Sequence, residues 1–319
     1  MRLRKHGFVV AGAVGCHLAM ASLSYAQAWL PPKGEAWVSL SYGHTLVKDH
    51  YFYDGERVKQ GEIRSHTALV DVGYSITDRL GVKLNLPYVA VKYKGVNPHM
   101  YPVDDGTTHG TFTDLHLEVR YNALQGPIVL TPFVAGVLPS HRYEYFGHAI
   151  AGNDVKQFLL GTGFGRRLDP FLPSGYVQGR YSYAFMERIE GIYHDRSNLD
   201  LQIGYFVTPS LQLFALGMGQ KSYGGLVFDR KIIPTTWTAS DFHHHGQVAR
   251  TDLLGVGGGA DFLATPALDV FATFLTTVAG RNDHAINAQF TLGLSVSFSP
   301  RQVLRKMSQP DSIRPIPEF

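Results

Sequence analysis

One short stretch of the sequence brings a histidine and a serine close together among other polar residues. It reads His194-Asp195-Arg196-Ser197-Asn198. A histidine that acts as a general base must lie about 3 Å from the serine hydroxyl that it activates. In a β-strand, residues three apart point to opposite faces, so His194 and Ser197 meet only if the backbone there is irregular. We therefore predict no catalytic residue here and no enzymatic activity.

Histidine and carboxylate side chains are also concentrated between the predicted strands. Imidazole and carboxylate groups are ligands of zinc, copper and nickel. The densest group is His243-His244-His245, two residues after Asp241. A compact ligand motif such as H-E-x-x-H is missing, so the solvation of polar loops explains these residues as well as a metal does. We expect no cofactor, and these three histidines are the first candidates if a metal is bound.

Aromatic residues form a third group in the same stretches. Examples are Tyr51-Phe52-Tyr53 and Tyr143-Glu144-Tyr145-Phe146, with Tyr223, Phe228, Trp237 and Phe242. An apolar lining with a few polar groups suits small organic ligands. The same residues also fit the aromatic belt at the surface of a membrane. Both interpretations remain open from the sequence.

The elements that must position these groups are β-strands with a strict two-residue period. Residues 286–298 alternate apolar side chains with polar or small ones from Ile286 to Phe298. Because successive side chains of a strand point to opposite faces, one face is apolar and the other polar. A tilted strand needs about nine to eleven residues to cross a bilayer. The segment is therefore predicted to be a membrane strand that closes a barrel against residues 36–46.

The same alternation recurs along the chain. Further strands are predicted near residues 36–46, 67–74, 80–88, 114–121, 128–145, 156–167, 175–187, 197–208, 210–221, 250–264 and 268–280. With the final segment this makes about twelve, an even number as in bacterial barrels. The predicted fold class is all-β: a membrane-spanning antiparallel up-and-down β-barrel.

The connections alternate between tight turns and longer loops, as in barrels of the outer membrane. Long loops are predicted at residues 47–64, 94–111, 146–155, 189–196, 223–249 and 281–285. A weak repeat marks the turns: Gly73-Tyr74-Ser75-Ile76-Thr77-Asp78-Arg79-Leu80 recurs around Thr208 and Thr265. Each copy carries an aromatic residue three positions before the threonine. These turns are predicted to be periplasmic.

Charged residues occupy the polar alternates of the strands. An arginine or lysine that faces lipid at mid-depth costs roughly 2–4 kcal/mol, so these side chains must point into the lumen. Both signs are present, which favours paired side chains over a lumen of a single charge. The predicted lumen residues are Asp71, Lys83, Asp114, His116, Glu118, Arg120, Arg180, Asp200, Asp261 and Asp269.

The two ends of the chain differ from the barrel. Residues 1–26 combine Arg2, Arg4 and Lys5 with an apolar run and a small-residue cleavage site, which predicts a signal peptide. Its removal takes Cys16, the single cysteine, and brings the formal net charge from +3 to zero. A balanced charge predicts no nucleic-acid partner. Residues 27–299 would form the barrel, and the basic, proline-rich residues 300–319 a periplasmic tail.

Several motifs together resemble a known family. They are Trp29-Leu30-Pro31-Pro32-Lys33-Gly34-Glu35, the turn around Thr77 followed by Leu84-Asn85-Leu86-Pro87-Tyr88, and Phe112-Thr113-Asp114-Leu115. The chain resembles the outer-membrane proteins grouped with the meta-pathway of phenol degradation, which are described as transporters. The resemblance implies a barrel fold and uptake of aromatic or other hydrophobic compounds, and it supplies no catalytic residues.

The sequence thus predicts a porin-like or transporter-like barrel in the bacterial outer membrane. Its expected partners are membrane lipid, lipopolysaccharide, a small-molecule solute and the barrel-assembly machinery. Two alternatives stay open: a barrel enzyme that acts on lipid or lipopolysaccharide, and a non-conducting structural or metal-binding surface protein.

Overall fold

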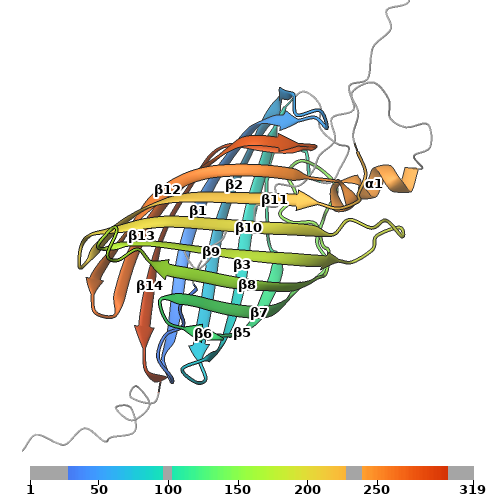
Figure 1. Ribbon diagram of the computed structural model, residues 1–319. Coiled ribbons are helices and arrows are strands. Elements are labelled where there is room, and N and C mark those ends of the chain that lie inside the picture. Colours follow the sequence, from blue (N-terminus) through green and yellow to red (C-terminus); the bar gives the residue numbers. More distant parts are fainter. Residues whose placement is uncertain (1–27, 96–102, 228–238, 301–319) are drawn as a thin grey trace, which may run out of the picture.

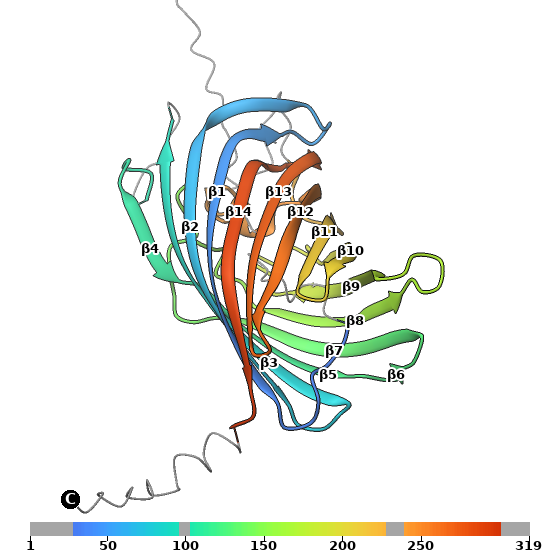
Figure 2. The same cartoon turned by 90° about the vertical axis from the view of Figure 1, so that its left-hand side faces the viewer.

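The alternating segments pair into one antiparallel sheet that closes on itself (Figures 1 and 2). The computed structural model describes residues 28–95, 103–227 and 239–300, so the predicted signal peptide and nearly all of the predicted tail lie outside the described residues. The strands are β1 (Ala36–Tyr51), β2 (Arg57–Ser75), β3 (Leu80–Lys94), β4 (Thr108–Phe112), β5 (Asp114–Tyr121), β6 (Leu124–Gln125), β7 (Ile128–Pro139), β8 (Gln157–Arg167), β9 (Gly175–Met186), β10 (Arg196–Thr208), β11 (Leu211–Ser222), β12 (Asp252–Thr265), β13 (Leu268–Arg281) and β14 (Asp283–Phe298).

Fourteen segments make twelve barrel strands, because β4, β5 and β6 follow one another between β3 and β7. The predicted all-β barrel and its number of strands are confirmed. One helix, α1 (Ala239–Val248), lies at the outer end in the described part of the chain (Figure 1). Among the described residues, no helix has the length and apolar character needed to cross a membrane.

The first and last strands close the barrel. Ala36 lies opposite Phe298 and Leu40 opposite Leu294, and the antiparallel register continues without a shift to Leu46 and Ala288. The apolar positions of β1 therefore face the same way as those of β14, and their alternation matches across the seam. The prediction that residues 286–298 pair back to the first strand is confirmed.

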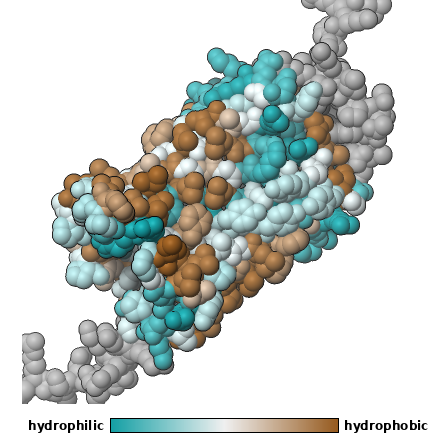
Figure 3. Space-filling view, viewed as in Figure 1, coloured by the Kyte–Doolittle hydropathy of each residue, from teal (hydrophilic) through white to brown (hydrophobic). Residues whose placement is uncertain are grey.

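The exterior of the barrel is apolar. Leu292 is 60% exposed and Leu40 is 50% exposed, whereas Ser39 and Ser41 between the outward residues of β1 are buried inside. Brown apolar patches accordingly cover much of the barrel wall in the space-filling view (Figure 3). Such a surface is unfavourable in water and suits contact with lipid.

The outer ends of several strands run further than the alternation indicates. Strands β1 and β2 continue to the pair Tyr51 and Arg57, so only residues 52–56 connect them. Strands β13 and β14 are separated by Asn282 alone, in a left-handed conformation with φ of 57°. The predicted long loops at residues 47–64 and 281–285 are therefore wrong. The backbone pairing continues there although the side-chain alternation is lost, and the Arg57–Asp49 ion pair at 2.7 Å connects the two polar strand ends.

The repeated turn has a common hydrogen-bond basis. The Thr77 hydroxyl accepts hydrogen bonds from the backbone amides of Arg79 and Leu80 at 3.1 and 2.9 Å. Thr208 repeats this with Ser210 and Leu211 at 3.2 and 3.0 Å. The threonine side chain thus replaces a backbone acceptor in the turn. This explains why the motif recurs at the turns of the barrel end that is predicted to be periplasmic and is called the periplasmic end below.

Removal of this hydroxyl should weaken the β10–β11 hairpin. We expect Thr208→Val to lower the free energy of unfolding by about 1 kcal/mol, because two amide donors lose their acceptor. The measurement is denaturant-induced unfolding in phospholipid micelles. Thr208→Ser keeps the hydroxyl and is the control, and equal losses in both variants would contradict the role of the hydrogen bonds.

Candidate functional site

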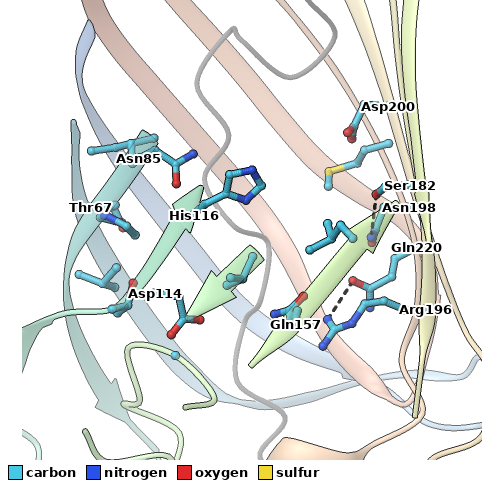
Figure 4. Close-up of a pocket in the computed structure, with 18 of the residues that line it drawn as sticks. Thr67, Asn85, Asp114, His116, Gln157, Ser182, Arg196, Asn198, Asp200 and Gln220 are labelled. Carbon is cyan, nitrogen blue, oxygen red and sulfur yellow. Dashed lines mark hydrogen bonds between the residues drawn. The ribbon is translucent and has the colours of Figure 1, made fainter. Parts of the chain in front are cut away.

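A cavity of about 280 Å³ lies inside the barrel. Most of its wall consists of inward side chains of the strands, and Ala151 and Gly152 reach it from the connection between β7 and β8. Polar residues from opposite walls face one another across it (Figure 4). Of the predicted lumen residues, those that line the cavity are Lys83, Asp114, His116, Glu118, Arg180 and Asp200.

A network of ion pairs crosses the lumen at the cavity. Arg180 of β9 donates two hydrogen bonds to Glu118 of β5, at 3.2 and 2.6 Å. His116 lies 3.3 Å from the same carboxylate, and Lys83 lies 3.4 Å from Asp71 on the neighbouring strand. Glu118 is only 3% exposed. The structure therefore brings five of the predicted lumen residues together, and among them Arg180 pairs with Glu118 and Lys83 with Asp71.

The other predicted lumen residues lie outside the cavity lining. Arg120 is buried near Gly81 on the periplasmic side of the ion pairs. Asp261 accepts a hydrogen bond from Gln212 at 2.7 Å, and Gln212 accepts one from the Tyr176 hydroxyl. Asp269 is half-buried on β13 near that end. These residues belong to a second polar layer rather than to the cavity.

The lumen also holds aromatic rings that the alternation does not predict. The Arg180 guanidinium lies 3.6 Å from the centre of the Phe133 ring, a cation–π contact. Trp37 of β1 covers Gly73 of β2, where a Cβ atom would lie 2.3 Å from the indole. Other inward rings are Tyr176, Phe214 and Phe271. A glycine directly across from an aromatic residue on the polar face of the next strand is the signal that would have identified them.

The segment before β1 enters the periplasmic end of the lumen. Ala28 is fully buried, its amide donates to Gln178 at 3.3 Å, and its carbonyl accepts from the Thr131 hydroxyl at 2.6 Å. Trp29 packs edge-on against Tyr176 with ring centres 6.4 Å apart. Thr131 lies on β7 and Gln178 on β9, across the barrel from β1 in the strand order. The segment therefore crosses the lumen from wall to wall.

The outer end of the lumen is covered by residues 140–156. Tyr143 donates a hydrogen bond to Asp114 in the cavity wall at 2.5 Å, and its oxygen accepts the amide of Asp154 at 3.0 Å. Burial raises the pKa of the Tyr143 hydroxyl well above its usual value, so it remains a proton donor to the carboxylate. This tyrosine therefore ties the covering loop to the lumen.

Loss of the Tyr143 hydroxyl should loosen this loop. We expect Tyr143→Phe to speed hydrogen–deuterium exchange at residues 143–154 about tenfold, because a hydrogen bond to a charged group contributes roughly 1.5–3 kcal/mol. Mass spectrometry of the folded protein in detergent measures it. Tyr53→Phe, on an exposed tyrosine of another outer connection, is the matched control. Unchanged exchange in Tyr143→Phe would show that other contacts hold the loop.

The three consecutive histidines lie on α1 with divergent rings. His243 stacks on Phe146 and His244 on Tyr145, with ring centres 4.8 and 5.3 Å apart, whereas His245 is buried. The rings of His243 and His244 are nearly perpendicular. They therefore pack α1 against the covering loop, and the predicted metal candidates do not converge on one point.

Other histidines gather beneath this cover. His50 and His284 from the outer ends of β1 and β14 have ring centres 5.2 Å apart, and His148 stacks on Tyr93 and lies 2.7 Å from Asp104. No group of three or more histidine, cysteine, aspartate or glutamate side chains in residues 28–95, 103–227 and 239–300 is arranged to hold a metal ion. This cluster thus contributes to the packing of the outer end.

The aromatic residues of the outer connections were predicted either to line a site for small organic ligands or to form a belt at the membrane surface, and they do not all lie in one place. Tyr145 and Phe146 pack in the cover, whereas Tyr223 is exposed and stacks on Tyr183 with ring centres 5.8 Å apart. Phe228 and Trp237 lie outside the described residues, as does the side chain of Phe242.

His194 and Ser197 do not form a catalytic pair. The Ser197 hydroxyl lies 2.9 Å from the Tyr181 hydroxyl and 3.3 Å from that of Tyr223. The His194 ring lies 3.3 Å from the carbonyl of Ile192 instead. Among the described residues no hydrogen bond joins the two side chains, and His194 precedes β10 whereas Ser197 lies in it.

The chain is similar to known proteins in its fold and not in its sequence. No family model and no curated protein matches the sequence. An outer-membrane channel from Pseudomonas putida F1 has a similar structure, with a TM-score of 0.65 and 15% identity over 85% of this chain and 98% of that one. At this identity the similarity shows the fold: the chain shares the closed antiparallel β-barrel of that channel.

Two further solved structures have a weaker similarity. The NalP translocator domain from Neisseria meningitidis gives a TM-score of 0.47 and 14% identity over 82% of this chain and 88% of that one. The NanC porin gives 0.46 and 8% over 81% and 98%. At such identities the similarity concerns the fold, so the activity has to be argued from the lumen.

Proposed function

We propose that this barrel is a channel that binds and passes small solutes across the outer membrane, without catalysis. The observation that carries the proposal is the cavity of about 280 Å³, lined by both polar and apolar side chains, inside an apolar barrel wall. Residues 28–30 cross the lumen on the periplasmic side of the cavity, and residues 140–156 lie at its outer end, so both segments narrow the path that a solute would take.

Aromatic or other hydrophobic compounds are the candidate solutes. Apolar side chains such as Leu159 and Met218 line the cavity beside its polar residues, and such a mixed lining suits small organic molecules. The resemblance to the barrels grouped with the meta-pathway of phenol degradation supports the same class. The separation of His194 from Ser197 argues against a barrel enzyme at that stretch.

Permeation tests the proposal directly. The full mature chain, reconstituted into liposomes, should accelerate swelling in arabinose relative to liposomes that carry heat-denatured protein. Planar-bilayer recordings provide a second measurement. Absence of permeation in both would contradict the channel.

A further inference from the structure

Arg196 is a buried cation in the cavity wall, and no carboxylate of the described residues is in contact with it. Its side chain enters from β10, and the residue is 8% exposed. Its one hydrogen bond among the described residues runs to Gln220 at 3.4 Å, which is long for an N–H donor. Asp283 and Asp114 attract it, but neither forms an ion pair with it among the described residues. Most of its N–H groups are therefore available to a molecule in the cavity.

The other cations of the cavity differ in this respect. Arg180 is held by Glu118 and Lys83 lies beside Asp71. A buried charge without a partner is costly. Carboxylates of the protein itself pair with Arg180 and Lys83. Arg196 is therefore the cation of the cavity that can pair with an anion from outside the chain.

The surroundings of Arg196 are polar on one side. Asn198, two residues further on the same face of β10, lies between Ser182 of β9 and Gln220 of β11 in the sheet register. The amide of Asn198 donates to Ser182 at 3.4 Å, so this contact is also long. Figure 4 shows Arg196, Gln220, Asn198 and Ser182 on one wall of the cavity, opposite Thr67 and Asn85.

Apolar side chains complete the same region. Leu159 of β8, Met218 of β11 and Leu253 of β12 line the cavity near that wall. A guanidinium next to apolar side chains is a site for a molecule with one anionic group and an apolar body. Planar carboxylates fit the two parallel N–H groups of arginine.

We propose that the cavity binds small organic monoanions, with Arg196 holding a carboxylate and Leu159, Met218 and Leu253 contacting the apolar body. Asp114 and Asp200 line the same cavity and disfavour a second negative charge. The cavity, at about 280 Å³, lies near the lower limit for small-molecule sites, which excludes large ligands. This inference rests on the proposed function, because it assigns a solute class to that lumen.

Calorimetric titration of the full mature chain in detergent tests the site, with benzoate as the anionic probe and benzyl alcohol as a neutral probe of similar shape. We expect benzoate to bind more tightly than benzyl alcohol. Arg196→Gln should weaken benzoate binding about tenfold or more and leave benzyl alcohol binding unchanged, since it removes a charge-assisted hydrogen bond. Arg196→Lys keeps the charge without the planar fork and should give an intermediate affinity.

Arg167→Gln is the matched control, because Arg167 is an exposed arginine at the end of β8 that pairs with Asp169. Absence of benzoate binding, equal binding of both probes, or unchanged affinity in Arg196→Gln would each overturn the proposal. Circular dichroism checks that each variant is folded. Arabinose permeation through the same proteins distinguishes the anion site from the channel function. Normal swelling together with unchanged benzoate affinity in Arg196→Gln refutes only the anion site. Absence of swelling refutes the channel.

Discussion

Removal of residues 28–32 is expected to raise the permeation of small neutral solutes severalfold. These residues precede β1 and cross the lumen to β7 and β9, where Ala28 is held by Thr131 and Gln178. On the way, Leu30 packs against Gly81 of β3. None of them contributes to the barrel sheet, so their loss should open the periplasmic end without breaking a strand pair.

Swelling of liposomes in arabinose measures this effect, with protein refolded from a chain that lacks the segment. Lys33→Ala is the control, because the Lys33 backbone amide rather than its side chain donates to Asp78 at 2.9 Å. Equal swelling rates for the shortened chain and the control would show that the segment does not obstruct the path. Trp29→Ala should give an intermediate rate, since it removes the contacts of the indole with Tyr176 and Gly165 but keeps the hydrogen bonds of Ala28.

Glu118→Gln is expected to lower the free energy of unfolding by about 3–5 kcal/mol. The substitution leaves the Arg180 guanidinium inside the barrel without its carboxylate, and a buried charge that loses its partner is strongly destabilising. It also removes the charge beside His116. Urea-induced unfolding in phospholipid micelles gives the value from the shift in midpoint.

A double variant distinguishes the lost ion pair from a packing defect. Glu118→Gln combined with Arg180→Gln should recover part of the loss, because both charges are then absent. Glu62→Gln is the control on a more accessible carboxylate: Glu62 pairs with Lys48 and Arg64 at the barrel's outer end, and its loss should cost less than about 1 kcal/mol. A double variant less stable than Glu118→Gln would contradict the ion-pair explanation.

The sequence by itself determined the wall of the barrel. Two-residue alternation is a local property, since each side chain points away from its neighbour whatever the rest of the chain does. Residues such as Leu292 and Leu294 therefore identified the lipid-facing side, and Thr77 and Thr208 marked the turns of the periplasmic end. The number of strands followed from the same pattern.

The outer connections could not be predicted in this way. At the outer ends of β1 and β2 the backbone pairing continues through polar residues as far as Tyr51 and Arg57. Backbone hydrogen bonds do not depend on side-chain polarity. Alternation therefore ends before the strands do, and residues that belong to extended strands were assigned to loops.

Only the tertiary structure decided what meets inside the barrel. Glu118 and Arg180 come from strands that are not neighbours, and their contact depends on the strand stagger and tilt of the closed sheet. The same geometry brings Ala28 to Thr131 and leaves Arg196 out of contact with every carboxylate in the described part of the chain. A two-residue period specifies on which side of the wall a side chain lies, but its height and its partner across the lumen follow from closure, because closure sets the register of all strands at once.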